Sequence, residues 1–349
     1  MKWLKDKLPL GIGKEVAIIQ VVKALTWKRL WNAVKNTSSF VLSAITKKNI
    51  VWGLPSIVNI EPTNICNLRC PLCITGSGKM QRPRGKMDFD DYKKFIDTVA
   101  GHVIYITLYH QGEPYLHSRF NDMVAYAKQY GLYVSTSSNA HYFNPESAEA
   151  VVKSGLDSMI ISLDGITQES YARYRVGGTL SVVLDGIRHV VAAKKRLDSK
   201  TPYLFAQFLV MKHNEHEIEE MKKLCTSLGL DRLLIKTTQV MSVEEAQEWL
   251  PENEKYSRYT VDEKKLIVKQ GTGACPRLWL TTLIDWDGHI VPCCFDKNGD
   301  YTMGHFAEKD DIFDTWKSDR YQRFRQQILK NRDAIDICRN CNYGIGLFK

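Results

Sequence analysis

The stretch IVNIEPTNICNLRCPLC, residues 57–73, places three cysteines within eight positions, directly after a short apolar run. The run IVNIEPT (57–63) contains β-branched residues in the density typical of a buried strand. Three thiolates on a loop of this length can bind a [4Fe-4S] cluster and leave one of its four irons without a protein ligand. A structural zinc site is the weaker alternative, because it needs a fourth cysteine or histidine and the next histidine, His102, lies far beyond Cys73 in the chain.

Beyond this stretch, short apolar runs alternate with helical patterns. Further strands are expected at residues 103–110, 132–138, 157–164, 203–211 and 232–238. Near-continuous apolar strands that are each followed by a helix indicate a parallel sheet covered by helices, an α/β fold. Six such units suit a partial (β/α)6 TIM-like barrel and are too few for a closed eight-fold one. In such folds the chemistry lies at the carboxyl ends of the strands, which is where the first cysteine group falls.

The positive charge is concentrated at one end of the chain. Residues 1–50 hold ten Lys and Arg against two acids, a charge of +8, so the rest of the chain carries only +1 of the net +9. A nearly neutral body argues against a basic groove for nucleic acid. The segment 16–35 predicts a helix, and the longest uncharged stretch, 36–46, is too short to span a membrane. We expect a helical cap on the main domain, with peripheral membrane contact through Trp27, Trp31 and the lysines as the alternative.

The nine cysteines point to a reducing compartment, because no secretory signal is recognisable, and so to a cytoplasmic protein, with association at the membrane periphery as the variant. Cys225 stands alone in a helical pattern and is interpreted as a buried apolar residue. The remaining eight form two groups. The C-terminal group is Cys275, Cys293, Cys294, Cys338 and Cys341. A hairpin turning at residues 287–288 and a helix at 314–330 lie between its members. A zinc ribbon is the alternative interpretation of this group.

Several short motifs at successive strand ends resemble those of the radical S-adenosylmethionine (radical SAM) superfamily, over about residues 55–345. Cys66, Cys70 and Cys73 match the family's C-x3-C-x2-C loop, in which the vacant iron binds S-adenosylmethionine (SAM). QGEP (111–114), SSNA (137–140) and SLDG (162–165) stand where the family contacts SAM. The resemblance assigns the methionyl end to Gln111, Gly112 and Glu113, and the rest of the SAM pocket to Ser137, Asn139, Ser162, Asp164 and Arg175. Leu72 and Gln111 depart from the usual motif residues without removing a ligand.

The C-terminal cysteines resemble the SPASM or twitch extension of these enzymes, a small α+β domain that holds auxiliary clusters. Five cysteines suit one auxiliary [4Fe-4S] cluster, ligated by Cys275, Cys293, Cys338 and Cys341, with Cys294 as the alternative to Cys293. The expected domains are residues 1–52, a basic helical segment; 53–238, the radical SAM partial barrel; 239–274, a linker; and 275–349, the auxiliary cluster domain.

The resemblance implies reductive cleavage of SAM to a 5′-deoxyadenosyl radical, which abstracts hydrogen from a substrate C–H bond, with a flavodoxin or ferredoxin-type electron donor. Net oxidation or tailoring of a small molecule, sugar or lipid-linked substrate is the first expectation. A maturase acting on a ribosomally made peptide or protein is the alternative, and a non-enzymatic metal-binding or electron-transfer protein is a third. Candidates for a catalytic proton acceptor are Tyr109, His110, Lys236 and Gln239.

Overall fold

A computed structural model describes residues 15–262, 265–269, 274–306 and 311–342. Residues 1–14 of the expected N-terminal segment lie outside the described residues, as do residues 307–310 and 343–349 of the expected auxiliary cluster domain. The same holds for residues 263–264 and 270–273 of the expected linker.

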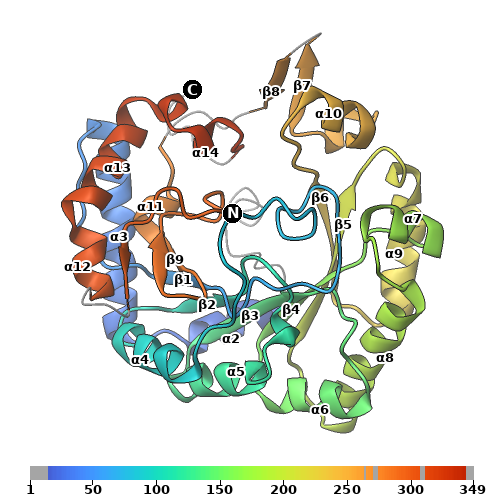
Figure 1. The fold of residues 1–349 in the computed structure, drawn as a ribbon. Coiled ribbons are helices and arrows are strands. Elements are labelled where there is room, and N and C mark those ends of the chain that lie inside the picture. The colour runs from blue at the N-terminus through green and yellow to red at the C-terminus, as the bar shows by residue number, and fades with distance from the viewer. Residues whose placement is uncertain (1–14, 263–264, 270–273, 307–310, 343–349) are drawn as a thin grey trace.

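Six parallel strands form the centre of the fold and pair in chain order. They are β1 (Ile57–Ile60), β2 (Tyr105–Leu108), β3 (Tyr133–Ser138), β4 (Ser158–Ser162), β5 (Tyr203–Val210) and β6 (Arg232–Thr237). The sheet curves, and helices cover its outer side (Figure 1). Each strand lies within a range expected from its apolar run, because apolar strands covered on both faces are the ones that sequence patterns mark most clearly. The α/β partial barrel is therefore confirmed.

The helices that cover the barrel follow the strands one by one. They are α4 (Phe89–Val99), α5 (Phe120–Gln129), α6 (Pro145–Lys153), α7 (Gln168–Tyr174), α8 (Leu180–Arg196) and α9 (Ile218–Ser227), with short 3-10 turns η1 (Pro114–Leu116) and η2 (Glu215–Glu217). Several begin at a capping side chain: Asp88 accepts from the first amides of α4, and Asn144 forms a capping box with Ser147 at α6. Cys225 is buried in α9, as its helical pattern predicts.

The C-terminal segment extends the same sheet. β9 (Thr281–Ile284) pairs parallel with β1, and β10 (His289–Val291) and β11 (Gly304–His305) continue antiparallel, which gives nine strands in the order β11-β10-β9-β1-β2-β3-β4-β5-β6. The predicted hairpin turn at residues 287–288 is confirmed. That the hairpin would join the barrel edge is not visible in the local sequence pattern.

The remaining C-terminal elements are α11 (Arg277–Leu280), α12 (Ile312–Lys317), α13 (Asp319–Lys330), η4 (Arg332–Ala334) and α14 (Asp336–Arg339). The single helix expected over 314–330 is wrong, since α12 ends at Lys317 and α13 begins at Asp319. The Ser318 hydroxyl accepts from the amide of Tyr321 and caps the second helix. The stretch expected as a linker contains α10 (Val243–Trp249), η3 (Glu254–Tyr256) and the small hairpin β7 (Tyr259–Asp262) and β8 (Lys265–Val268).

Two helices precede the barrel, α2 (Glu15–Lys23) and α3 (Trp27–Thr46). The continuous helix expected over 16–35 is wrong because the chain breaks at Thr26, whose side chain caps α3. Trp279 and Trp316, both buried, donate their indole N–H groups to the carbonyls of Ile50 and Gly53, which ties the C-terminal helices to the segment after α3. Among the described helices, none is both long and apolar enough to cross a membrane.

Candidate active site and cluster sites

One pocket of about 120 Å³ opens at the carboxyl ends of the first four strands. Its lining includes Cys66, Cys70, Cys73, Tyr109, His110, Gly112, Glu113, Ser137, Ser138, Asn139, Ser162 and Arg175. These residues lie at or after the carboxyl ends of β1, β2, β3 and β4, so four separate chain segments converge on the same space. The cysteine loop is brought beside the polar strand ends, as the barrel topology requires.

The cysteine loop is better suited to binding an iron-containing cluster than to carrying free thiols. Burial raises the pKa of Cys66 to about 11 and also raises the pKa of Cys70, so neither is a thiolate at neutral pH without nearby positive charge. Iron supplies that charge, and metal ligation deprotonates thiols. The loop itself is tightly folded, since a methyl group at Gly76 would lie 2.5 Å from the backbone nitrogen of Cys70.

The loop after β2 packs closely against the segment that leads into the cysteine loop. Gly112 has a φ of +75°, and a Cβ there would lie 2.5 Å from the carbonyl oxygen of Thr63 and 2.7 Å from that of Ile65. The amide of Glu113 donates to the Ile65 carbonyl at 2.8 Å. Only glycine satisfies both the positive φ and the close approach, so this residue holds the Glu113 side chain at the pocket.

The Glu113 carboxylate is buried and is held by three donors. It accepts from the Ser138 hydroxyl and the Asn139 amide, both at 2.8 Å, and from the Tyr115 amide at 3.2 Å. Burial raises its pKa to about 7 despite these hydrogen bonds. A ligand ammonium group beside it would favour the carboxylate, so the site is suited to a positively charged amino group.

A second charged side chain, Arg175, faces the pocket from the loop after α7. Its Nε donates to Asp164 at 2.6 Å, and one terminal nitrogen lies 3.8 Å from the Cys70 sulfur. Asp164 is fully buried and its other oxygen accepts from the amide of Leu209. Asp164 therefore fixes the guanidinium, while the remaining donors of Arg175 are available to an anionic ligand beside the cysteine loop.

The expected pocket residues divide into two sets. Gly112, Glu113, Ser137, Asn139, Ser162 and Arg175 line the pocket, as do the catalytic candidates Tyr109 and His110. Gln111 and Asp164 lie behind the lining: Gln111 accepts from Thr75 at 3.2 Å, and Asp164 positions Arg175. Lys236 and Gln239 are outside the pocket, and Gln239 accepts from Lys297 at 3.3 Å. Burial lowers the pKa of His110 to about 4, so its imidazole is neutral.

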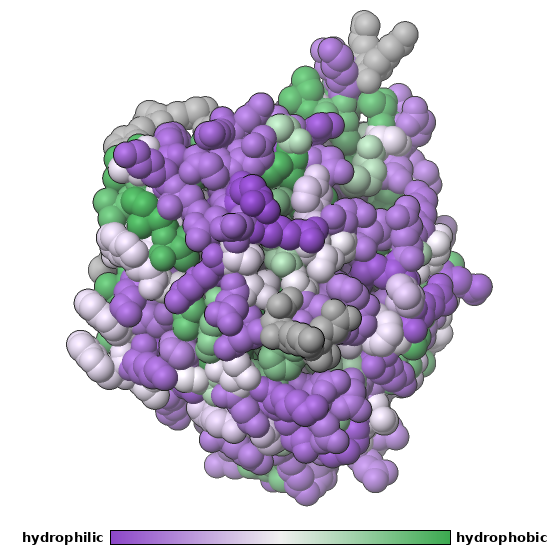
Figure 2. Space-filling view, turned by 60° about the vertical axis from the view of Figure 1, so that its left-hand side comes forward, coloured by the Kyte–Doolittle hydropathy of each residue, from purple (hydrophilic) through white to green (hydrophobic). Residues whose placement is uncertain are grey.

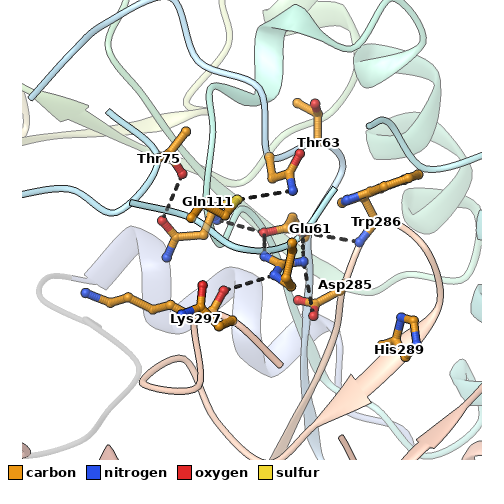
Figure 3. Close-up of polar contacts among 12 residues, drawn as sticks. Glu61, Thr63, Thr75, Gln111, Asp285, Trp286, His289 and Lys297 are labelled. Atoms are coloured by element: carbon orange, nitrogen blue, oxygen red, sulfur yellow. Dashed lines mark hydrogen bonds and ion pairs between the residues drawn. The ribbon is translucent and has the colours of Figure 1, made fainter. Parts of the chain in front are cut away.

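Some residues of the site are not among those expected from the sequence. Ser138, which donates to Glu113, lies inside the SSNA motif but was not singled out there. Glu61 and Asp285 directly follow the adjacent strands β1 and β9 (Figure 3). Arg82 forms ion pairs with both. Arg82 donates to both oxygens of Glu61 at 2.8 Å, and its guanidinium lies 3.1 Å from Asp285. Glu61 could be anticipated from its place directly after the first strand, whereas the sequence around Arg82 contains no pattern that indicates its role.

The C-terminal cysteines form a second group. Cys275, Cys338 and Cys341 lie close enough for each to influence the charge state of another, and Cys293 interacts in the same way with Cys275. Burial raises the pKa of Cys275, Cys293 and Cys338, so these thiols also need a bound metal ion nearby to become thiolates at neutral pH. Cys294 also acts on Cys293, more strongly than Cys275 does, and its sulfur lies 3.0 Å from a guanidinium nitrogen of Arg277. These placements fit a four-cysteine cluster site.

Comparison with known proteins agrees with both cysteine sites. Residues 60–225 match the radical SAM superfamily, and residues 275–342 match SPASM, an iron-sulfur cluster-binding domain. The chain belongs to the radical SAM superfamily and carries a SPASM domain. It is therefore a radical SAM enzyme, with SAM and a [4Fe-4S] cluster as cofactors and auxiliary iron-sulfur binding in its SPASM domain.

Among its relatives is the tungsten-containing aldehyde ferredoxin oxidoreductase cofactor-modifying protein of Pyrococcus furiosus, 25% identical over 312 residues that cover 81% of this chain and 86% of that protein. The mycofactocin maturase MftC of Mycobacterium ulcerans is 27% identical over 50% of this chain, and the match spans 45% of that protein's length. Streptococcus suis SuiB with bound SAM shares the fold, at a TM-score of 0.62 and 15% identity, over 89% of this chain and 77% of SuiB. SuiB has also been solved with its precursor peptide SuiA.

Proposed function

We propose that this radical SAM enzyme is a maturase that modifies a peptide or protein substrate at an unactivated C–H bond. When bound, SAM and the reduced cluster supply the chemistry, in which one-electron cleavage gives methionine and a 5′-deoxyadenosyl radical that removes hydrogen from the substrate. The main support for this reaction is that the three cysteines line the same pocket as Glu113 and Arg175.

In this proposal each pocket residue binds or orients. Cys66, Cys70 and Cys73 are the protein ligands of the open cluster. Glu113, held by Ser138 and Asn139, accepts from the amino group of SAM, and Arg175, fixed by Asp164, donates to its carboxylate. Such charge-assisted contacts orient a flexible ligand because both partners are held rigidly before it arrives. Ser137 and Ser162 complete the polar side of the pocket, and Gly112 keeps the loop after β2 close enough for these contacts.

The relatives favour a peptide substrate over the small molecule, sugar or lipid-linked substrate first expected from the sequence, since MftC is a maturase and SuiB has been solved with a precursor peptide. The space near the second cysteine group is also basic. Burial lowers the pKa of Lys236, Arg258 and Lys297, and the positive charge of Arg258 lowers the pKa of both lysines further. This grouping suits a substrate with an anionic group, such as an acidic side chain of a peptide.

The auxiliary cluster is proposed to transfer electrons, since a cluster with four protein ligands has no vacant iron for substrate. Acceptance of an electron from a substrate radical would make the reaction a net oxidation. A flavodoxin or ferredoxin-type donor is proposed to reduce the cluster at Cys66, Cys70 and Cys73. We also propose a peripheral membrane contact through the N-terminal helices.

The test is an anaerobic assay of the reconstituted and reduced enzyme with SAM and a short peptide encoded beside its gene. We expect 5′-deoxyadenosine to form and the peptide mass to change, and both to disappear in the Cys66→Ala, Cys70→Ala, Cys73→Ala triple variant. A peptide deuterated at the reacting carbon transfers its label to 5′-deoxyadenosine. Label transfer from a sugar or lipid-linked compound instead would reject the peptide assignment, and no 5′-deoxyadenosine at all would reject the enzyme.

A further inference from the structure

The outer face of α3 carries exposed apolar side chains in both of its halves, with the polar residues Thr37 and Ser38 between them. Six of its side chains, at helical spacing, form one stripe exposed to solvent: Trp27, Leu30, Trp31, Val34, Val41 and Ile45. Trp27 is 78% exposed and Trp31 is 52% exposed. Ile19 and Val22 on α2 and Trp52 after α3 are exposed as well. Figure 2 brings the side of the molecule that carries α3 forward, and apolar residues gather there among mostly hydrophilic neighbours.

The inner face of the same helix is mostly polar, although Phe40 and Ala44 on it pack into the hydrophobic core. Its buried residues include Arg29, Asn32, Asn36, Ser39 and Ser43. Asn32 exchanges hydrogen bonds with the backbone of Leu54 at 2.8 and 2.9 Å, and Ser43 does so with Ile50 at 2.9 and 3.1 Å. Ser39 accepts from the Trp52 amide. The helix is thus fixed by specific polar contacts, and rotation about its axis to bury the apolar stripe would break them.

Positive charge surrounds the stripe. Lys23, Lys28, Lys47 and Lys48 are exposed and Lys35 is half-buried, and no acidic residue occurs between Ile19 and Trp52. Within the described residues no ion pair involves any of these lysines. Lys35 lies 5.9 Å from the centre of the Trp31 ring. Tryptophan beside lysine at the border of an apolar face is the composition of helices that lie in the interface of an anionic bilayer.

We propose that the apolar stripe of α3, with its flanking lysines, docks the enzyme on the surface of a bilayer that contains anionic lipids. Exposed tryptophans enter the region between headgroups and acyl chains, and the lysines contact lipid phosphates. A second protein is the less favoured occupant, because a protein face matched to this surface would have to be both apolar and acidic.

The position of α3 also determines how the docked enzyme is oriented on the membrane. Arg29, near the start of the helix, donates to the carbonyls of Ala100, Tyr130 and Gly131, which precede β2 and β3. That end of the barrel is opposite the SAM pocket, which opens where β1 to β4 end. Docking through the start of α3 therefore leaves the pocket open to water-soluble substrates, and the contact holds the enzyme at the membrane without taking part in catalysis.

The test is co-sedimentation of the full, cluster-containing enzyme with two kinds of vesicle, one of phosphatidylcholine alone and one of phosphatidylcholine mixed equally with phosphatidylglycerol. We expect binding to the anionic vesicles that weakens with added salt. Binding should be about thirtyfold weaker after Lys28→Ala and Lys35→Ala together, since each lysine near an anionic surface adds about 1 kcal/mol. Trp27→Glu with Trp31→Glu should abolish binding.

Val182→Glu is the matched control, since Val182 is an exposed apolar residue on α8, outside the stripe, at 42% exposure. This variant should bind vesicles as the unaltered enzyme does. SAM cleavage should be unchanged in all variants, which separates a failed docking surface from a misfolded or inactive enzyme. Equal binding by the tryptophan variant would overturn the proposal, as would a dimer in the absence of lipid that Trp31→Glu converts to monomer.

Discussion

Glu113 couples SAM binding to pH. Burial raises its pKa to about 7, so the side chain is largely a neutral acid below that pH and a carboxylate above it. Because only the carboxylate attracts an ammonium group strongly, we expect the affinity for SAM to be highest above pH 7 and to fall about tenfold for each pH unit below it.

The measurement is the SAM dissociation constant of the reconstituted enzyme between pH 6 and 8. Glu113→Gln should bind weakly and show a flatter profile, because the amide does not titrate. The amino group of SAM titrates in both proteins, so the difference between the two curves reports Glu113 alone. Parallel curves would show that another group controls binding.

Gly112 can be tested against a glycine that shares its backbone conformation but not its surroundings. Gly112→Ala places a methyl group 2.5 Å from the Thr63 carbonyl, whereas Gly131, also at positive φ, has open space around its position. Gly131→Ala should cost about 1 kcal/mol of unfolding free energy from backbone strain alone. Gly112→Ala should cost about 3 kcal/mol and weaken SAM binding, because the loop that carries Glu113 must also move. Thermal unfolding and SAM binding distinguish the two variants.

The sequence indicates the pocket residues where a motif combines a residue type with a strand end. Glu113 and Asn139 are predictable in this way because their motifs end β2 and β3. Gln111 and Asp164 lie behind the pocket lining, although Glu113 and Ser162, two residues away in the QGEP and SLDG motifs, line it. A regular extended strand would turn residues two apart to the same side, so the backbone departs from regular strand geometry here, as the positive φ of Gly112 shows for QGEP. Which member of a motif faces the ligand depends on backbone dihedral angles that the motif does not contain.

At the scale of elements, strands and their order are predictable but their most distant pairing is not. Each of β1 to β6 pairs with its neighbour in the chain, the arrangement favoured when a helix connects parallel strands. By contrast, Ile57 of β1 pairs with Thr281 of β9, although the whole barrel lies between them in the sequence. A hairpin pattern predicts β9 and β10 from local turn chemistry. It contains no information about which edge of the sheet accepts them.

The join between β1 and β9 depends on Arg82. The Glu61 and Asp285 side chains at the ends of these strands are both fully buried, and the 7% exposed Arg82 lies between them. Removing the cation leaves two acids facing each other in the interior, and loss of one partner of a buried ionic group costs about 3–5 kcal/mol. We therefore expect Arg82→Met to lower the unfolding temperature of the enzyme strongly, and Arg82→Met with Glu61→Gln to recover part of the loss.

An exposed arginine provides the control for this variant. Arg188 pairs with Asp185 three residues earlier on α8, and both side chains are more than half exposed. Arg188→Met should change the free energy of unfolding by less than about 0.5 kcal/mol, because exposed pairs contribute little. If Arg82→Met were equally mild, the charged group would have no role in holding the C-terminal hairpin to the barrel.

At the scale of the whole molecule, the two cysteine sites are parts of one continuous sheet. The SPASM segment begins at Cys275 and returns through β9 to pair with β1, the strand that leads into the SAM cluster loop. The two sites also approach each other at Tyr109, which lines the SAM pocket: the charge of Cys294, in the second cysteine group, adds to the effect of burial in raising the pKa of that phenol. The sequence predicts two cysteine sites. Only the structure shows that one sheet carries both, which fixes the distance between them.

The adjacent cysteines Cys293 and Cys294 provide the sharpest test of this arrangement. Cys293 interacts with Cys275, whereas the Cys294 sulfur lies beside Arg277 and near Tyr109. The reconstituted enzyme should contain about eight irons per chain, four at each site, and replacing Cys66, Cys70 and Cys73 with Ala should remove about half.

In that triple-variant background, where only the second cluster remains, Cys293→Ala should remove most of the remaining iron and its visible absorption. Cys294→Ala should retain both, because the cysteines whose charge acts on Cys338 are Cys275 and Cys341, whereas the charge of Cys294 acts on Tyr109 in the SAM pocket. The reverse result would exchange their roles and make Cys294 the cluster ligand. Iron loss in both variants would mean that the two adjacent thiols share the cluster.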